Sequence, residues 1–134
     1  SSPEALVKCS NGDILIADTG NNRVRRVEAG TGIVTTVLGD GVAASSGEGA
    51  PSREFPVNQP LGLACDSLGN VVVTSTNTIR LLLADGSGVV DGSGQVRTIY
   101  KVAPGERFTD AHFLDDRTLV ITASGSGRLL QLAR

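Results

Sequence analysis

The sequence is poor in aromatic residues and in several residue types that catalytic or metal sites usually require. Its 134 residues include three Phe, one Tyr, no Trp and no Met, and His112 is the only histidine. The formal net charge of −2 provides no positive field to attract nucleic acid or anionic lipid. No apolar run approaches membrane-spanning length, and residues 1–10 lack an apolar signal core. We therefore expect no nucleic-acid ligand and no membrane span, and an extracellular or periplasmic location would require a signal removed upstream.

Cysteine is also scarce, since only Cys9 and Cys65 occur. Two cysteines are too few for a disulfide framework, and no histidine cluster accompanies them to make a zinc site. We favour two buried, reduced thiols that pack as small hydrophobic residues, with a Cys9–Cys65 bridge as the alternative.

Aliphatic and turn-forming residues are abundant. The chain contains 15 Val, 14 Leu and 6 Ile, a largely β-branched supply that favours strands, and 17 Gly with 5 Pro indicate many turns. No stretch sustains a 3.6-residue apolar period, and Gly interrupts every candidate helix. The composition therefore predicts an all-β fold.

One pattern occurs three times along the chain, at residues 5–17, 62–74 and 110–122. Each copy has a short apolar strand, a polar turn and three consecutive aliphatic residues. These triplets begin at Ile14, Val71 and Leu119, spaced 57 and then 48 residues apart. Another strand follows each triplet, and a fourth follows in the first two copies, at residues 32–38 and 95–102.

Repeated units of four short strands indicate a β-propeller. A strand of a β-sandwich has one face in water, so apolar and polar residues should alternate along it. Neighbouring blades cover both faces of a propeller blade, so consecutive residues of its strands can be apolar. We predict a single partial propeller over residues 1–134. Its expected parts are blade 1 at about 5–39, a linker at 40–60, blade 2 at about 61–102 and an incomplete, three-stranded blade 3 at about 107–134.

The most specific segments of this pattern resemble the NHL-repeat family of β-propellers. The residues that carry the resemblance are 11–27, 31–39, 47–51, 58–66 and 69–70. This linker form is typical of bacterial NHL propellers and similar to the NHL segment of teneurins. Family members with lyase or lactonase chemistry use His, Asp and Glu around a central metal, a set that this sequence does not supply. Others bind RNA on a basic face with stacking aromatics, which net charge −2 and four aromatic residues disfavour.

The most polar cluster follows the first triplet and reads as a structural turn rather than a ligand or metal site. In this interpretation Gly20 supplies a positive φ, and Arg23 pairs with Asp18. The turn comprises Asp18, Gly20, Asn21, Asn22 and Arg23.

Four other residues are candidates for contact with a partner: Phe55, Arg25, Arg26 and His112. We favour a Phe55 that is tucked under its linker over one offered to a partner, and a solvated strand end for the two arginines. Asp110, Asp115 and Asp116 surround His112, but no nucleophile or metal-ligand spacing accompanies them, so a structural or surface histidine is favoured.

Two Asp-Gly-Ser-Gly segments begin at Asp85 and Asp91. Acidic residues beside glycines can bind calcium, but the order of EF-hand ligands is absent, and we favour a flexible hairpin. We therefore predict no catalytic, cofactor or metal residues.

Together these features predict a non-enzymatic NHL propeller module that mediates protein–protein interaction. One alternative is a fragment of a propeller lyase or hydrolase whose metal site lies in absent blades, and another is a structural spacer in a large extracellular protein. Three blades do not close a ring. The expected partners are another protein, the remaining blades of a propeller, or a second copy that completes a six-bladed dimer.

Overall fold

The computed structural model describes residues 3–41, 51–76, 78–101, 107–115, 117–124 and 128–133. The residues described form eleven strands in three antiparallel sheets, and two short 3₁₀ turns are their only helical segments. The predicted all-β class is therefore confirmed. The 3₁₀ turns are η1 (Thr19–Asn21) and η2 (Ser52–Glu54).

Each sheet is a meander whose strands pair in chain order. Blade 1 contains β1 (Pro3–Lys8), β2 (Ile14–Asp18), β3 (Arg23–Val27) and β4 (Val34–Leu38). Blade 2 contains β5 (Gly62–Cys65), β6 (Val71–Thr74), β7 (Thr78–Leu82) and β8 (Val96–Lys101). Blade 3 contains β9 (Arg107–Asp115), β10 (Thr118–Ser124) and β11 (Arg128–Ala133).

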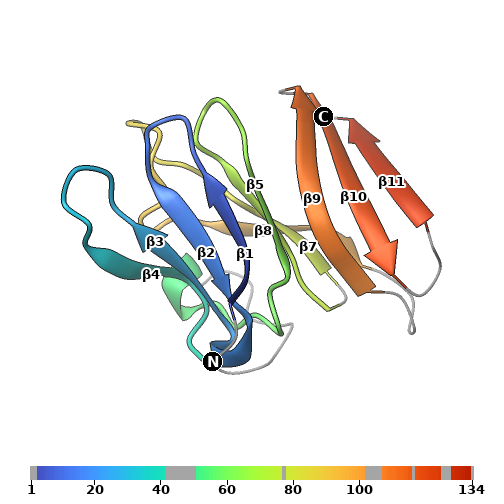
Figure 1. Ribbon diagram of the computed structural model, residues 1–134, viewed down its shortest axis with the longest axis horizontal. Helices are drawn as coiled ribbons and strands as arrows, with labels where there is room; N and C mark the ends of the chain where they lie inside the picture. The colour runs from blue at the N-terminus through green and yellow to red at the C-terminus, as the bar shows by residue number, and fades with distance from the viewer. Residues whose placement is uncertain are drawn as a thin grey trace.

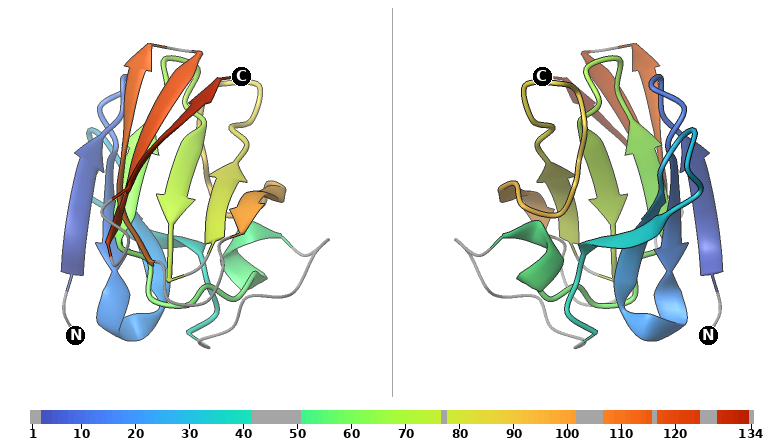
Figure 2. Two further views of the ribbon diagram at one scale, coloured as in Figure 1. Left: turned by 90° about the vertical axis from the view of Figure 1, so that its right-hand side faces the viewer. Right: turned by 90° about the vertical axis from the view of Figure 1, so that its left-hand side faces the viewer.

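The three sheets stand side by side as blades (Figure 1). The first strand of each blade is the inner one, since β1 contacts β5 and β5 contacts β9. The outer strand β4 instead contacts η2, which lies across the molecule from β1 (Figure 2). This radial arrangement of a four-, a four- and a three-stranded sheet is the predicted partial propeller.

Apolar side chains fill the two spaces between neighbouring blades. Leu15, Val24 and Val37 of blade 1 belong to one core cluster with Leu63 and other residues of blade 2. A second cluster joins blade 2 to blade 3. Its buried residues are Ala64, Val72, Ile79, Phe108, Ala111, Leu119 and Ile121. Burial of these surfaces is the main favourable contribution to folding, at about 25 cal/mol per Å² of apolar area.

The burial of each aliphatic triplet depends on which faces of its blade are covered. In the central blade Val71, Val72 and Val73 are all buried, because blade 1 covers one face and blade 3 the other. In blade 1 Leu15 is buried, while Ile14 and Ile16 are only partly buried on the opposite face. The physical reason for expecting consecutive apolar residues thus holds at the blade that has two neighbours.

The two cysteines form a disulfide, so the favoured interpretation as reduced thiols is wrong. Cys9 follows β1, and Cys65 ends β5. Their Cα atoms are 5.5 Å apart although the residues are separated by 56 positions in the sequence. Contact between the inner strands brings the two residues together, and a scan for local cysteine motifs does not detect such a pairing.

Candidate functional site

The turn after β2 is structural, as predicted, but its geometry differs from the prediction. Thr19, Gly20 and Asn21 form η1, and the left-handed residue is Asn22, at φ 53° and ψ 49°. Gly20 does not have a positive φ, so that part of the prediction is wrong. The 3₁₀ turn extends to Asn21 and moves the left-handed position to its C-terminal cap, where Asn is tolerated.

The predicted Asp18–Arg23 ion pair is also wrong. Asp18 Oδ2 accepts a hydrogen bond from Asn21 Nδ2 at 3.0 Å and lies 3.4 Å from Arg25 Nε. Arg23 instead donates from Nη2 to the carbonyl oxygen of Asp40 at 3.1 Å. Asp18 and Arg23 are directly opposite in the strand register, but their side chains find different partners.

The same turn is attached to the linker that leads to blade 2. Asn22 Oδ1 accepts a hydrogen bond from the backbone N–H of Gln59 at 2.9 Å, and Thr19 Oγ1 donates to the carbonyl oxygen of Pro60 at 2.6 Å. These contacts fix the entry of the chain into β5. The polar cluster therefore connects blade 1 to the linker that leads to blade 2.

Arg25 and Arg26 are not a solvated strand end. Arg26 Nε lies 2.7 Å from Asp13 Oδ2, and both side chains are largely buried. Burial raises the pKa of Asp13, but the hydrogen bond from the Ala29 backbone and the contact with Arg26 outweigh it and hold that pKa below its ordinary value. Arg26 therefore neutralises a buried carboxylate, while Arg25 lies beside Asp18 and Thr36.

Phe55 is fully buried, as its favoured interpretation expects, and it is not exposed to a partner. Its ring packs under Arg80, whose guanidinium carbon lies 4.5 Å from the ring centroid. Arg80 Nη1 also donates to the carbonyl oxygen of Pro56 at 2.8 Å. This cation–π contact and hydrogen bond attach the linker to the face of blade 2.

His112 lies in β9 and is exposed, directly opposite Val120 of β10. Asp115 accepts a hydrogen bond from the backbone N–H of Arg117, while Asp116 lies outside the described residues. Within the described ranges, no three or more His, Cys, Asp or Glu residues are grouped so that they could hold a metal ion.

The two Asp-Gly-Ser-Gly segments form local turns. Asp85 Oδ1 accepts hydrogen bonds from Ser87 Oγ and from the backbone N–H groups of Ser87 and Val89, and Asp91 Oδ1 accepts from Ser93. Hydrogen bonds from the Ser87 and Ser93 hydroxyl groups are the largest of the interactions that lower the pKa values of Asp85 and Asp91. Each carboxylate therefore stabilises its own turn.

No other described blade covers the outward face of blade 1, which lies opposite the face that packs on blade 2. Its apolar side chains include Leu6 and Val34, which are strongly exposed. We call this surface the open face of blade 1, and it comprises Leu6, Lys8, Ile14, Ile16, Asp18, Arg23, Arg25, Val27, Val34 and Thr36.

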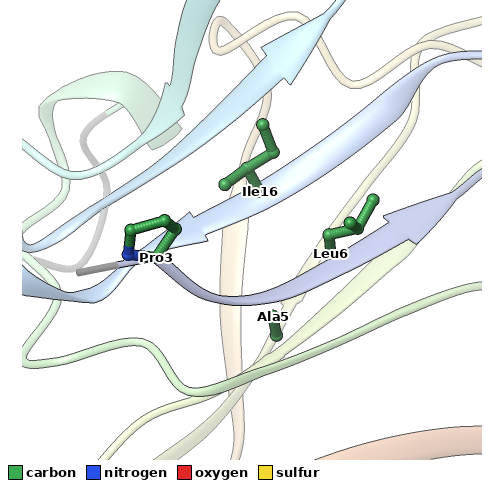
Figure 3. Close-up of a pocket in the computed structure, with 4 residues that line it drawn as sticks. All are labelled: Pro3, Ala5, Leu6 and Ile16. Carbon is green, nitrogen blue, oxygen red and sulfur yellow. The ribbon is translucent and has the colours of Figure 1, made fainter.

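A shallow pocket lies at the inner end of this open face. It has a volume of about 350 Å³ and is lined by Pro3, Ala5, Leu6 and Ile16. Figure 3 shows that Leu6 of β1 and Ile16 of β2 project to the same side of the sheet. An exposed apolar surface with a hollow is typical of an interaction site.

Sequence reasoning identified Arg25 but missed Arg80. The signal was present, because Val24-Arg25 and Ile79-Arg80 are both an aliphatic residue followed by arginine in the third strand of a blade.

Comparison with known proteins supports this architecture. The NHL repeat model matches residues 1–27. Virginiamycin B lyase from Staphylococcus aureus is similar in structure, with a TM-score of 0.61 and 17% identity over 99% of this chain and 41% of the lyase. The PQQ-bound aldose sugar dehydrogenase from Streptomyces coelicolor gives a TM-score of 0.65 and 23% identity over 96% of this chain and 39% of the enzyme.

These similarities identify the fold, because identities below one quarter do not carry an activity from one protein to another. No curated protein sequence matches the chain. The chain spans about two fifths of the length of the two enzymes compared. None of the helical segments described is long and apolar enough to cross a membrane. The chain thus carries an NHL repeat in its first blade and folds as part of a β-propeller.

Proposed function

We propose that this propeller segment is a non-enzymatic module that binds another protein through the open face of blade 1. The single observation that carries the proposal is the exposure of Leu6, which lines the pocket with Ile16. Apolar surface of this kind is unfavourable in water and becomes favourable when a partner covers it.

The disulfide supports a location outside the reducing cytosol. Cys9 is buried, and the Cys9–Cys65 bond joins two blades, so its role is structural. Structural disulfides persist in oxidising compartments, which favours an extracellular or periplasmic protein.

A charge placed on the open face tests the proposal. Leu6→Glu introduces a carboxylate at an exposed position, so the fold should be retained while partner binding is lost. Leu68→Glu is the matched control, because Leu68 is equally solvent-exposed but lies in the turn between β5 and β6. Cross-linking in extracts of the source cells, followed by mass spectrometry, should identify a partner captured by the wild type and the control but not by Leu6→Glu. Equal capture by all three proteins would contradict the proposal.

A further inference from the structure

The turn between β1 and β2 contains a chemically reactive pair of residues, Asn11 and Gly12. Of the six asparagines in the sequence, only Asn11 is followed by glycine. The backbone nitrogen of the next residue can attack the side-chain amide carbon of an asparagine, and glycine hinders this attack least because it has no side chain. Asn11 is exposed, and its turn lies at one end of blade 1 rather than on a face that packs against a neighbouring blade (Figure 1). The pair is therefore accessible to the water that the reaction consumes.

Hydrogen bonds keep this pair from reacting while the turn is closed. Gly12 N–H donates to the carbonyl oxygen of Cys9 at 3.0 Å, so the attacking nitrogen is already engaged. Asn11 Oδ1 accepts from the backbone N–H of Asp13 at 2.9 Å, and Asn11 Nδ2 donates to Asp13 Oδ2 at 3.2 Å. The turn thus fixes both the nitrogen and the amide, and attack requires the turn to open.

The turn is anchored at both of its ends. Cys9 is bonded to Cys65 of blade 2, and the Cys9 N–H donates to the carbonyl oxygen of Asp13 at 2.8 Å. Asp13 Oδ1 accepts from the backbone N–H of Ala29, and Asp13 Oδ2 lies 2.7 Å from Arg26 Nε. The disulfide restrains the residue whose carbonyl oxygen accepts the glycine N–H. Loss of that bond should therefore raise the population of the open turn.

We infer that Asn11 is a site of spontaneous deamidation and that the Cys9–Cys65 disulfide controls its rate by keeping the turn closed. In the first step, the Gly12 nitrogen bonds to the side-chain amide carbon of Asn11, the bond to the amide nitrogen breaks, and that nitrogen leaves as ammonia with the proton of Gly12. In the second step, water opens the resulting succinimide at either carbonyl carbon and yields aspartate or isoaspartate. This inference does not depend on the proposed function.

Either product weakens the anchor at Asp13. Aspartate replaces the donor Asn11 Nδ2 by a second carboxylate beside Asp13, and like charges repel. Isoaspartate also lengthens the main chain by one carbon atom, which displaces Asp13 from Ala29 and Arg26. Asn11→Asp reproduces the first product and should therefore lower the melting temperature. An unchanged melting temperature would show that the turn tolerates the second carboxylate.

Incubation of the full chain at mildly alkaline pH tests the site and its control together. Three samples are compared: the oxidised wild type, the chain with Cys9→Ala and Cys65→Ala, and a peptide of residues 7–15 with Cys9→Ala as the unstructured reference. Digestion and mass spectrometry then measure deamidation and isoaspartate at each asparagine. The peptide should react fastest, the wild type at least about tenfold more slowly, and the double variant at an intermediate rate.

Two controls separate the inference from general chemical ageing. Asn70 lies in the equivalent turn of blade 2 but precedes the β-branched Val71, so it should stay intact while Asn11 reacts. Gly62→Ala disturbs the contact between blades 2 and 3 and leaves the disulfide in place, so its Asn11 should react at the wild-type rate. This variant distinguishes opening of the turn from global unfolding.

Several results would overturn the inference. A wild type that reacts as fast as the peptide would show that the turn does not protect Asn11. Equal rates in the wild type and the double cysteine variant would show that the disulfide does not control the reaction. Equal modification of Asn70 would refute the site, and a Gly62→Ala chain that reacts as fast as the double variant would assign the reaction to global unfolding.

Discussion

Cys9 and Cys65 join the first blade to the second through a disulfide at their inner strands, with their Cα atoms 5.5 Å apart. The cross-link spans a sequence separation of 56 residues, which includes the outer strands of blade 1 and the whole linker. It therefore restricts the unfolded chain over a long loop, in addition to the apolar contacts between β1 and β5.

Removal of this cross-link should destabilise the fold without abolishing the strand pattern. A chain with both Cys9→Ala and Cys65→Ala should lose about 2–4 kcal/mol of unfolding free energy, because its unfolded state gains conformational freedom. Urea denaturation followed by circular dichroism measures the loss. A reducing agent should lower the stability of the wild type by a similar amount and leave the double variant unaffected. An unchanged denaturation midpoint in the double variant would show that the bond does not contribute to stability.

Arg26 should be important for stability because it neutralises Asp13 in a largely buried site. Arg26→Ala leaves that carboxylate without its cationic partner and should cost about 3 kcal/mol at neutral pH. Denaturation of Arg26→Ala, Asp13→Asn and the double variant gives the coupling between the two side chains. If the single losses simply add in the double variant, the pair is not an energetic unit.

The same pair should make stability depend on pH. The pKa of Asp13 is lower in the folded chain than its ordinary value, so its contribution is present above that ordinary value and is lost as pH falls through the lowered value. Stability of the wild type should therefore fall on acidification, and Asp13→Asn should show a smaller fall. Unfolding free energies measured at neutral and acidic pH compare the two chains, and equal slopes would exclude Asp13 as a source of the acid sensitivity.

The turn at η1 predicts different sensitivities at Gly20 and Asn22. Asn22→Ala should cost about 1–2 kcal/mol, because alanine is strained in the left-handed region and the acceptor for the Gln59 N–H is lost. Asn22→Gly should cost less, since it relieves only the backbone strain. Gly20→Ala should change the melting temperature little, because Gly20 does not have a positive φ. Thermal melting of the three variants would contradict this description if Gly20→Ala proved the most damaging.

Close approach of blades 2 and 3 should make Gly62 sensitive to any side chain. A Cβ at Gly62 would lie 2.6 Å from the Asp110 Cα and 2.6 Å from Thr74 Oγ1, so backbone must shift. Gly62→Ala should destabilise the chain by about 2 kcal/mol, as overpacking does elsewhere. Gly86→Ala is the control, because a Cβ at Gly86 has nothing within 4 Å. Equal denaturation midpoints for the two variants would show that the blades separate freely here.

Local sequence was sufficient to predict the blades. Each triplet is a strand of consecutive aliphatic residues next to a turn with Gly or Asp, so the elements can be read without long-range information. The complete burial of Val71, Val72 and Val73 explains why the central triplet shows no alternation. Phe55 could likewise be assigned to the interior, because a large apolar ring in a long linker gains most free energy when it is covered.

Pairings between side chains could not be predicted in the same way. Arg25 rather than Arg23 approaches Asp18, because the choice depends on rotamers and on the carbonyl of Asp40 that the linker brings near Arg23. A positive φ was predicted at Gly20, but the 3₁₀ turn places that conformation at Asn22. Both differences depend on the path that the chain takes through the turn and the linker, which the residue types alone do not set.

The sequence by itself determined the three repeats, the strand content and the largely aliphatic core, since these follow from local periodicity and turn chemistry. Only the tertiary structure decided that Cys9 meets Cys65 and that Arg80 covers Phe55. It also decided that Arg25, in the third strand of blade 1, lies beside Asp18 and Thr36. The first two relationships depend on how neighbouring blades stack, and stacking joins residues whose separation along the chain carries no periodic signal.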